Sequence, residues 1–284
     1  MTRIAYVNGE FVPLEEAKIS ILDRGFLFAD GVYEVTAVID GKLVDNEAHL
    51  LRLERSLGEI EMGHSVPLDT LTDLQLELAK RNNLKEGGIY LQVTRGAAER
   101  DFAYPKDAEP SLVMFTQERD LINDPRAETG VSVVTTPDLR WKRRDIKSVA
   151  MLAQAMAKQE AAKAGASEAI MVEDGVVTEG SSSTAWIVKD GTLITRRLSN
   201  AVLPGITRLS VLELCAELGL KVEERTYTVD ELYEADEAFI TAATTLVMPV
   251  VKVDDRILSN GAPGEIASRL RGLYIENARK TAVG

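Results

Sequence analysis

The spacing of apolar and polar positions predicts strands and helices from the first residues onward. Residues 3–12 form a predicted hairpin, because Asn8 and Gly9 make a two-residue turn signal between two apolar runs. A helix is predicted from residue 47, with Asn46 as its N-cap, since leucines then recur at helical spacing. The other elements predicted in this part are strands at residues 32–39 and 42–44, hinged at Asp40-Gly41, strands at 88–95 and 111–116, and a second helix after residues 67–69.

A polar, proline-containing segment at residues 119–127 is typical of a linker and separates a second part of the chain. In that part a long helix is predicted over residues 147–164. We therefore predict an α+β fold with a small α/β domain at residues 1–118 and a larger domain at 128–284. The remaining predicted elements are a strand at residues 131–136, a hairpin pair within 168–194, a helix after 203–207, strands near 238–247 and a closing helix from 263.

Composition narrows the classes of function. With 33 Lys and Arg against 45 Asp and Glu, the formal net charge is −12, so a basic surface for nucleic acid is not expected. A membrane span is not expected, because the longest apolar stretch, residues 238–251, contains three threonines and falls short of the ~20 residues needed. One cysteine cannot form an internal disulfide, and strand-like sequence begins at once, so we expect a cytoplasmic protein.

Few residues of the chain suit metal binding or nucleophilic catalysis. The two histidines are His49 and His64, and Cys215 is the single cysteine. A closed zinc site needs about four such ligands, so no metal is expected. Cys215 lies on the apolar face of a predicted helix, which is typical of a buried thiol. Because the motifs of serine hydrolases, P-loop proteins and dinucleotide-binding proteins are missing, an enzyme with this sequence would use a lysine, carboxylates or a cofactor.

Lys147 follows a cluster of cations, Arg140-Trp-Lys-Arg-Arg, at the start of the predicted long helix. Like-charge repulsion from such neighbours favours a neutral amine, and the apolar residues that follow would shield it from water. A neutral, desolvated lysine is what imine formation with a carbonyl cofactor requires. The alternative is that Lys147 is a solvated surface lysine.

Two further segments are candidates for cofactor binding. Glu179 lies between an apolar strand and a Ser-rich turn, where a carboxylate could pair with a protonated ring nitrogen, as in pyridoxal phosphate enzymes. The alternative is an exposed acid in a hairpin turn. Leu203-Pro-Gly-Ile-Thr precedes a predicted helix whose first N–H groups and dipole suit a phosphate. The alternative there is an ordinary helix start.

Taken in order, four motifs resemble the class-IV aminotransferases, the fold-type-IV pyridoxal phosphate enzymes, and the resemblance runs nearly end to end. The Asp30-Gly-Val-Tyr-Glu-Val segment is most similar to the D-amino-acid aminotransferase branch, because the branched-chain branch typically has a different aromatic-Glu-Gly pattern there. The four motifs are His49-Leu-Leu-Arg52, Asp145-Ile-Lys147-Ser, Thr178-Glu179-Gly-Ser-Ser-Ser and Leu203-Pro-Gly-Ile-Thr-Arg208.

The resemblance implies a fold and a set of cofactor contacts. The fold is a small α/β sandwich and a larger α/β pseudo-barrel domain, with pyridoxal 5'-phosphate between them, in a homodimer. Lys147 would hold the cofactor as an imine and move the substrate proton, and Glu179 would keep the pyridine nitrogen protonated. Leu203 would pack on the ring face. The implied cofactor-binding residues are Arg52, Lys147, Glu179, Ser182, Leu203, Ile206, Thr207 and Thr244.

The implied substrate site departs from the family pattern at one position. Relatives acting on D-amino acids bind the α-carboxylate with a tyrosine and an Arg-x-His pair from the partner subunit. Tyr33, Val35 and Arg100 match this arrangement, but Phe102 stands where the histidine is expected. A phenyl ring donates no hydrogen bond, so part of the carboxylate site is lost or is supplied by another arginine. The candidates for that role are Arg24, Arg143 and Arg144.

We therefore predict an aminotransferase that moves an amino group between a D-amino acid of the D-alanine or D-glutamate type and a 2-oxo acid, with activity on (R)-amines in addition. The alternatives are an (R)-amine or branched-chain amino-acid aminotransferase, an aminodeoxychorismate lyase-like enzyme and a non-catalytic binding protein. Small-molecule amino acids, amines and 2-oxo acids are the expected partners, with no nucleic acid and no membrane. The resemblance also implies a homodimer with its active site completed across the interface.

Overall fold

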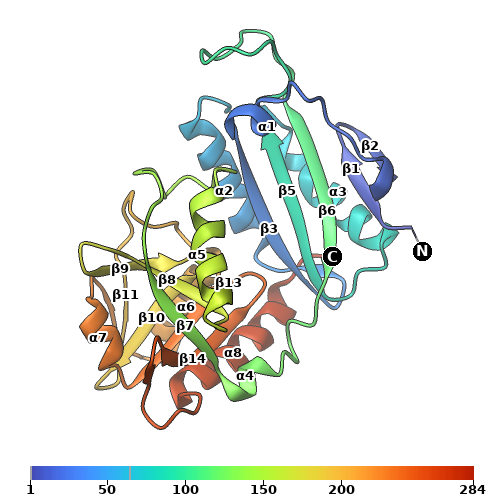
Figure 1. The fold of residues 1–284 in the computed structure, drawn as a ribbon. Helices are drawn as coiled ribbons and strands as arrows, with labels where there is room; N and C mark the ends of the chain where they lie inside the picture. The colour runs from blue at the N-terminus through green and yellow to red at the C-terminus, as the bar shows by residue number, and fades with distance from the viewer. Residues whose placement is uncertain (1, 64) are drawn as a thin grey trace. The chain divides into compact units, whose positions relative to one another are not determined.

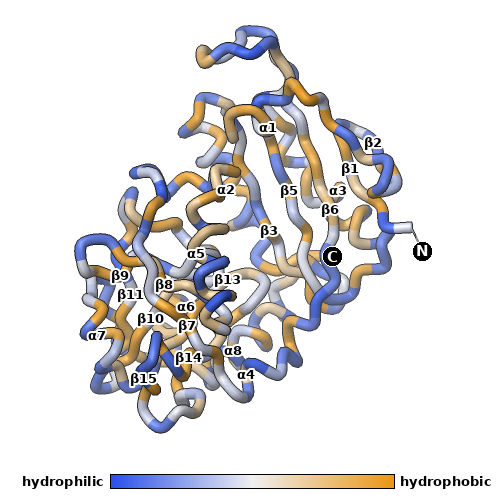
Figure 2. Tube along the Cα trace, in the orientation of Figure 1, coloured by the Kyte–Doolittle hydropathy of each residue, from blue (hydrophilic) through white to orange (hydrophobic). Residues whose placement is uncertain are grey.

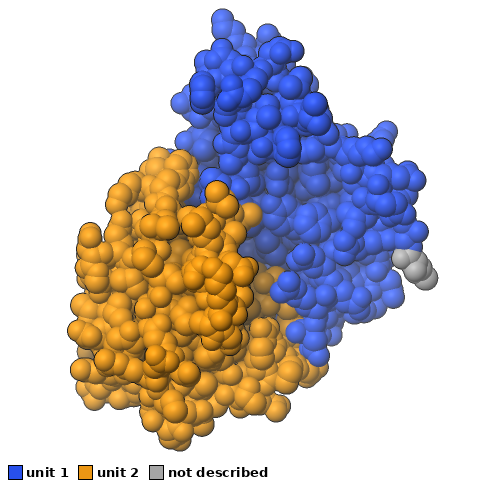
Figure 3. Space-filling view, in the orientation of Figure 1, with its two compact units in different colours: residues 1–120, 146–150, 278–284 blue, residues 121–145, 151–277 orange. Residues whose placement is uncertain are grey.

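The computed structural model (Figure 1) describes residues 2–63 and 65–284, so His64 lies outside the described residues. The chain forms two compact units, coloured separately in Figure 3. Unit 1 contains Met1–Asp120, Ile146–Ala150 and Ala278–Gly284, and unit 2 contains Leu121–Asp145 and Met151–Asn277. Unit 1 therefore includes two short segments that the sequence pattern assigned to the second part of the chain.

Unit 1 is built on a six-stranded sheet in the order β2-β1-β6-β5-β3-β4, in which all neighbouring strands are antiparallel. The helices α2 and α3 lie along one face of this sheet (Figure 1). Its elements are β1 Ile4–Val7, β2 Glu10–Pro13, η1 Leu14–Glu16, α1 Arg24–Phe28, β3 Gly31–Ile39, β4 Lys42–Leu43, α2 Asn46–Glu59, α3 Leu68–Arg81, β5 Gly87–Thr94 and β6 Ser111–Glu118.

The core of unit 1 forms where the leucine stripes of its two long helices meet the central strands. Leu53 and Leu57 of α2 and Leu71 of α3 are buried against Leu91 of β5 and its neighbours. Figure 2 shows apolar residues recurring along these strands. Burial of one face of each element therefore explains why the sequence shows a period near two in the strands and near 3.6 in the helices.

Both predicted hairpin turns of unit 1 are confirmed. Asn8 and Gly9 have φ of 47° and 101°, and the corresponding values for Asp40 and Gly41 are 54° and 80°, which is the left-handed backbone of a tight hairpin turn. The predicted cap of α2 is wrong: Asp45 is the N-cap residue, although its side chain makes no capping hydrogen bond, and the Asn46 side chain donates to Thr72 Oγ1 instead.

Unit 2 is built on a nine-stranded mixed sheet in the order β12-β11-β10-β13-β14-β7-β8-β9, with β15 paired to β14. The pairs β7–β8, β7–β14 and β11–β12 are parallel, and the other pairs are antiparallel. Its strands are β7 Val131–Pro137, β8 Glu168–Glu173, β9 Val176–Gly180, β10 Thr184–Lys189, β11 Thr192–Thr195, β12 Val222–Glu224, β13 Glu237–Ala242, β14 Leu246–Val253 and β15 Arg256–Ile257. The helices of this part of the chain are α4 Arg126–Thr129, α5 Leu152–Lys163, α6 Ile206–Glu217, α7 Val229–Tyr233 and α8 Glu265–Thr281.

The predicted start of the long helix is wrong. Helix α5 begins at Leu152, whereas Ser148 forms an isolated antiparallel bridge with Val32 of β3. The Tyr33 N–H donates to the Lys147 carbonyl at 3.0 Å, and the Val149 N–H donates to the Gly31 carbonyl at 3.0 Å. The edge of β3 thus satisfies backbone groups that a helical turn would otherwise satisfy, and this tertiary pairing overrides the helical pattern.

Two general features bear on function. Within residues 2–63 and 65–284, no helix combines the length and the apolar character needed to cross a membrane. Over the same described residues, no group of three or more His, Cys, Asp and Glu side chains is arranged to hold a metal ion.

Candidate active site

Lys147 lies beside β3 in unit 1, on an extended segment that is fixed by its backbone. Its Nζ atom is 4.2 Å from the centroid of the Tyr33 ring, and its side chain is half-buried. Side chains alternate along a strand, so Tyr33 and Val35 lie on the face of β3 opposite the buried Glu34. Tyr33 stacks on Tyr90 with ring centroids 5.5 Å apart, which fixes the orientation of its ring. The structure therefore brings together two of the predicted site residues, Lys147 and Tyr33.

The cations that precede Lys147 in the sequence are all paired with carboxylates. Lys147 itself has no ion pair within the part of the chain that the structure describes. The carboxylates of these ion pairs oppose the like-charge repulsion that the sequence predicted, and Lys147 differs from residues 140–144 in having no carboxylate partner among the described residues. The pairs are Arg140 with Asp138 and Glu179, Lys142 with Glu173, Arg143 with Asp145, and Arg144 with Glu173 and Asp138.

Arg52 forms a two-point ion pair with Glu34 in the interior of unit 1. Its Nε and Nη2 atoms donate to the two carboxylate oxygens at 2.7 and 2.6 Å, and His49 Nδ1 lies 2.8 Å from Glu34 Oε2. Burial acts to raise the pKa of Glu34, but the charge and hydrogen bonds of Arg52, with the hydrogen bond to His49, lower it to about 2. Arg52 is a predicted phosphate ligand, and Glu34 holds it in place.

Glu34 and His49 were not singled out as site residues from the sequence. One signal could have found them. Glu34 alternates with Tyr33 and Val35 on a strand, which places a carboxylate on the core-facing side. A buried carboxylate needs a cation, and Arg52 follows in the next helix, α2, three residues after His49.

Glu179 is buried in unit 2, with 5% of its surface exposed, so the alternative of an exposed acid in a turn is wrong. Arg140 Nη1 donates to Glu179 Oε1 at 2.5 Å, and the Leu203 N–H donates to both carboxylate oxygens at 3.1 and 3.2 Å. Burial raises the pKa of Glu179 above its usual range, and the charge of Arg140 only partly opposes this. The carboxylate is therefore fixed in position and poorly solvated.

Arg140 is itself held by a second buried carboxylate. Asp138 accepts from Arg140 Nε at 3.0 Å and Nη2 at 2.7 Å, and from Thr178 Oγ1 at 2.7 Å. The sequence analysis treated Arg140 as one member of a cation cluster and did not consider Asp138. In the structure the two residues link β7 to β9 and hold the carboxylate of Glu179 in one orientation.

Ser182, a predicted cofactor-binding residue, contacts Glu168 in this structure. Its Oγ atom donates to Glu168 Oε2 at 2.7 Å, and the neighbouring Ser181 and Ser183 hydroxyls also donate to Glu168. Glu168 is buried, and Lys158 Nζ lies 3.2 Å from its Oε1. The Ser-rich turn is thus fastened to β8, and the contact of Ser182 with a cofactor stays a prediction.

The predicted phosphate-binding segment of unit 2 has donors to offer. Helix α6 begins at Ile206 after Gly205, without a side-chain cap, so its first-turn N–H groups remain for an anion. A Cβ atom at Gly205 would lie 2.7 Å from Thr184 Oγ1, which requires a glycine there. Thr244 lies in the turn between β13 and β14, where the buried Thr245 Oγ1 lacks a hydrogen-bond partner among the described residues. This donor set, with the carboxylate of Glu179, fits the phosphate and ring-nitrogen ends of pyridoxal phosphate.

Arg100 and Phe102 lie on an exposed loop after β5 in unit 1. The Arg100 guanidinium carbon is 5.3 Å from the Phe28 ring centroid and 5.6 Å from that of Phe102, which is 78% exposed. Arg100 has no carboxylate partner among the residues that the structure describes. The other candidate arginines are engaged: Arg24 pairs with Asp30, Arg143 with Asp145 and Arg144 with Glu173.

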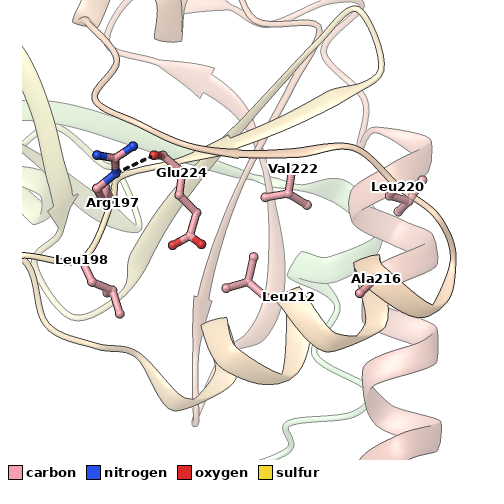
Figure 4. Close-up of a pocket in the computed structure, with 7 residues that line it drawn as sticks. All are labelled: Arg197, Leu198, Leu212, Ala216, Leu220, Val222 and Glu224. Carbon is pink, nitrogen blue, oxygen red and sulfur yellow. Dashed lines mark hydrogen bonds between the residues drawn. The ribbon is translucent and has the colours of Figure 1, made fainter.

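A cavity of about 590 Å³ lies elsewhere in unit 2 (Figure 4). Leu212 and Ala216 of α6 and Val222 and Glu224 of β12 line it, and Arg197 donates to the Glu224 carbonyl at its rim. None of the predicted site residues lines this cavity, so it does not belong to the candidate active site.

Comparison with known proteins places the chain in a family. Residues 31–253 match the family described as Amino-transferase class IV. The chain is 41% identical to a D-alanine aminotransferase of Bacillus licheniformis over 93% of each chain, and 40% identical to one of Staphylococcus aureus over 94% of each. Among solved structures, a branched-chain aminotransferase of Thermoproteus uzoniensis with norvaline is 26% identical, with a TM-score of 0.86 over 97% of this chain and 94% of that one.

The family match over residues 31–253 and the relatives of about 40% identity show that the chain belongs to the class IV aminotransferases. This confirms the family resemblance and the predicted two-domain α+β fold of type IV. Enzymes of this class use pyridoxal phosphate as their cofactor, and two solved branched-chain relatives, 27% and 28% identical to this chain, carry its pyridoxamine and phosphopyridoxyl forms.

Proposed function

We propose that the protein transfers an amino group between a D-amino acid of the D-alanine or D-glutamate type and a 2-oxo acid, with pyridoxal phosphate bound to Lys147. The observation that carries the proposal is the Lys147 amine, held beside Tyr33 without an ion-pair partner among the described residues while every neighbouring cation is paired. The relatives named D-alanine aminotransferase, about 40% identical over most of the chain, support the substrate class.

In this proposal the chain holds the cofactor at three points. Bound pyridoxal phosphate supplies an aldehyde that condenses with amines and a ring that accepts electrons. The N–H groups of Ile206 and Thr207, with Arg52 and Thr244, hold the phosphate. Glu179 would pair with the ring nitrogen and keep a proton on it, and Arg140 and the Leu203 N–H keep its carboxylate oriented. Lys147 is the proton carrier, because its amine is not engaged by a carboxylate.

Arg100 is the proposed ligand of the substrate carboxylate. Its guanidinium can bind a carboxylate at two points, and charge-assisted bonds of this kind are the strong ones. Phe102 adds only apolar surface beside it, which favours a second activity on (R)-amines that lack a carboxylate. In line with the family resemblance, we propose a homodimer in which the Arg100 loop completes the partner's site.

An amino-donor screen tests this proposal. The purified enzyme would be given 2-oxoglutarate with D-alanine, L-alanine, L-leucine, (R)-1-phenylethylamine or (S)-1-phenylethylamine, and glutamate formation would be measured. We expect D-alanine to be the best donor and the (R)-amine to be used more slowly. A preference for L-leucine would instead identify a branched-chain enzyme. Failure to consume 2-oxoglutarate with any donor would favour a lyase.

Subunit mixing tests the proposed dimer. Lys147→Ala and Arg100→Ala subunits, each impaired alone, would be mixed under conditions that exchange subunits. If Arg100 acts on the partner's site, a mixed dimer contains one intact site, and D-alanine activity returns. If Arg100 acts on the site of its own chain, no mixed dimer is intact, and activity stays low.

A further inference from the structure

The loop that carries Arg100 is held by another arginine, Arg24. The Arg24 Nη1 atom donates to the carbonyl of Asp101 at 2.6 Å and to that of Ala103 at 3.4 Å, and Nη2 donates to the carbonyl of Phe102 at 3.4 Å. Three consecutive carbonyls therefore turn toward one guanidinium. The side chains of Arg100 and Phe102 are exposed on the outside of the same turn.

The buried carboxylate of Asp30 fixes the Arg24 side chain. Its Nε atom donates to Asp30 Oδ2 at 2.7 Å, and the same oxygen accepts from Arg95 Nε at 2.8 Å. Arg24 is only 3% exposed, so its guanidinium is not available to a substrate. Its backbone N–H also donates to the carbonyl of Gly96 at 2.8 Å, at the start of the loop.

This arrangement needs an arginine. A guanidinium offers five N–H donors in a rigid plane, so one side chain can bond Asp30 and three carbonyls at once. A lysine ammonium has only three donors on a flexible stem and cannot span the same set. Arg95 is a useful contrast, because it shares Asp30 and its guanidinium carbon lies 3.6 Å from the centroid of the Tyr104 ring, but it donates its other hydrogen bonds to the carbonyls of Ile60 and Glu61 and none to residues 101–103.

From these contacts we infer that Arg24 is a positioning residue for substrate selection: it fixes the backbone of residues 101–103 so that Arg100 is presented to the substrate carboxylate. The inference rests on the proposed function, because it takes Arg100 as the carboxylate ligand. Arg24 acts through the loop and does not touch the substrate.

The kinetic consequence is specific. Arg100 binds the same carboxylate before and during the reaction, so a displaced Arg100 weakens binding without slowing the chemical step. Arg24→Gln should raise KM for D-alanine about tenfold, the value of one charge-assisted hydrogen bond, while kcat at saturation changes less than about twofold. Rates with (R)-1-phenylethylamine, which has no carboxylate, should be unchanged.

Three variants separate the loop contacts from other effects of Arg24. Arg24→Lys keeps the charge beside Asp30 but not the fork, so it should resemble Arg24→Gln, and it serves as the test protein if the glutamine variant does not fold. Arg95→Gln removes the other guanidinium from Asp30 and from the Tyr104 ring but keeps the carbonyl hydrogen bonds of Arg24, so it should leave KM for D-alanine within about twofold of the parent value. An increase as large as that of Arg24→Gln would assign the effect to Asp30 or Tyr104 and overturn the inference.

The double variant with Arg100→Ala makes the test decisive. If Arg24 acts only through Arg100, adding Arg24→Gln to Arg100→Ala should change KM for D-alanine no further. An additional tenfold increase, or an equal loss of rate with the (R)-amine, would show general damage and overturn the inference.

A readout without substrate keeps this inference separate from the proposed function. Loss of the carbonyl contacts should free the loop, so trypsin should cut after Arg100 several-fold faster in Arg24→Gln than in the parent protein. Cleavage after the exposed Arg126 of α4 should not change. Unchanged cleavage after Arg100 would overturn the role of Arg24. Faster cleavage in a protein that does not use D-alanine would leave Arg24 as the residue that holds the loop and would reject the proposed function instead.

Discussion

The segment around Lys147 in unit 1 and the segment around Glu179 in unit 2 hold their functional side chains in different ways. Lys147 is fixed by backbone hydrogen bonds to β3, while its amine lies over the face of the Tyr33 ring. Glu179 is fixed by its side chain, which accepts from Arg140 and from the Leu203 N–H. Lys147, which must form and release bonds, thus has a side chain free to move on a fixed backbone. Glu179, which must hold one charge in place, is instead fixed by hydrogen bonds to its carboxylate.

The largest expected effect on turnover comes from removing the Lys147 amine. Lys147→Ala should lower turnover of D-alanine at least about 10³-fold, because general acid–base work alone is typically worth 10²–10⁴-fold. Cofactor should still bind through the phosphate contacts, as measured by dialysis and absorbance. Borohydride reduction of the parent enzyme, followed by peptide mapping, should attach the cofactor to Lys147. Attachment to another lysine would show that Lys147 is not the residue that binds the cofactor.

A second prediction compares two buried carboxylates, Glu34 and Glu179. The pKa of Glu34 is lowered to about 2 from a usual value of 4.5, so its ion pair stabilises the fold above about pH 4.5 and is lost as the pH falls toward 2. Glu34→Gln should lower the free energy of unfolding at pH 7 by about 3 kcal/mol, and the difference should shrink below pH 4.5. Because the pKa of Glu179 is raised, Glu179→Gln should show no such acid-side convergence.

Denaturant titrations at pH 7, 4.5 and 3 would measure this difference. The matched control is Glu77→Gln, which breaks the exposed ion pair with Arg81 on α3. That change should cost less than about 1 kcal/mol at any pH. Equal losses of unfolding free energy in Glu34→Gln and Glu77→Gln would mean that burial does not make the Glu34–Arg52 ion pair more stabilising than the exposed Glu77–Arg81 pair.

Arg100 extends the comparison to substrate binding, because it too lacks a carboxylate partner among the described residues. Arg100→Ala should cost about 1.5–3 kcal/mol in kcat/KM for D-amino acids, the range for a hydrogen bond to a charged group, and leave the (R)-amine rate nearly unchanged. Phe102→His is the complementary variant and should shift the preference toward D-amino acids. Equal losses with both classes of donor would show that Arg100 is not the carboxylate ligand.

The smallest effect is expected for the substitution of Glu179. Glu179→Gln keeps a hydrogen-bonding group of the same shape but removes the negative charge, so kcat should fall about tenfold while cofactor affinity changes little. Stopped-flow measurement of the D-alanine half-reaction would report this directly. A variant that loses the cofactor but turns over normally when saturated would show that Glu179 serves binding and not the chemistry.

Local patterns predicted most of the fold. The hairpin turns at Asn8-Gly9 and Asp40-Gly41 were found because their left-handed backbone favours these residues. Helix α3 and the strands β5 and β6 followed from apolar spacing. The start of α5 was missed because residues 147–149 pair with β3, which is far away in the sequence, and no local pattern records such a partner.

The candidate site shows the same limit. Lys147 and Glu179 were singled out from their motifs, but the partners of the charged residues were not predicted. The ion pair of Glu34 with Arg52 joins residues 18 positions apart, and that of Arg140 with Glu179 joins residues 39 apart, so both depend on how strands and helices pack. The sequence predicted like-charge repulsion on Lys147 from the preceding cations, whereas in the fold each cation of residues 140–144 pairs with a carboxylate.

Unit 1 is made of three separate segments of the chain, so it cannot finish folding until residues 278–284 have been synthesised. Leu43 of β4 exchanges two backbone hydrogen bonds with Val283, at 2.8 and 2.9 Å, and β3 pairs with residues 147–149. A ribosome releases β3 and β4 long before either partner segment, so both strand edges stay open while the rest of the chain is made. Open strand edges favour association with other chains. We therefore expect the nascent chain to need protection until residues 278–284 emerge, and a chain shortened to end before Val283 to leave the edge of β4 exposed.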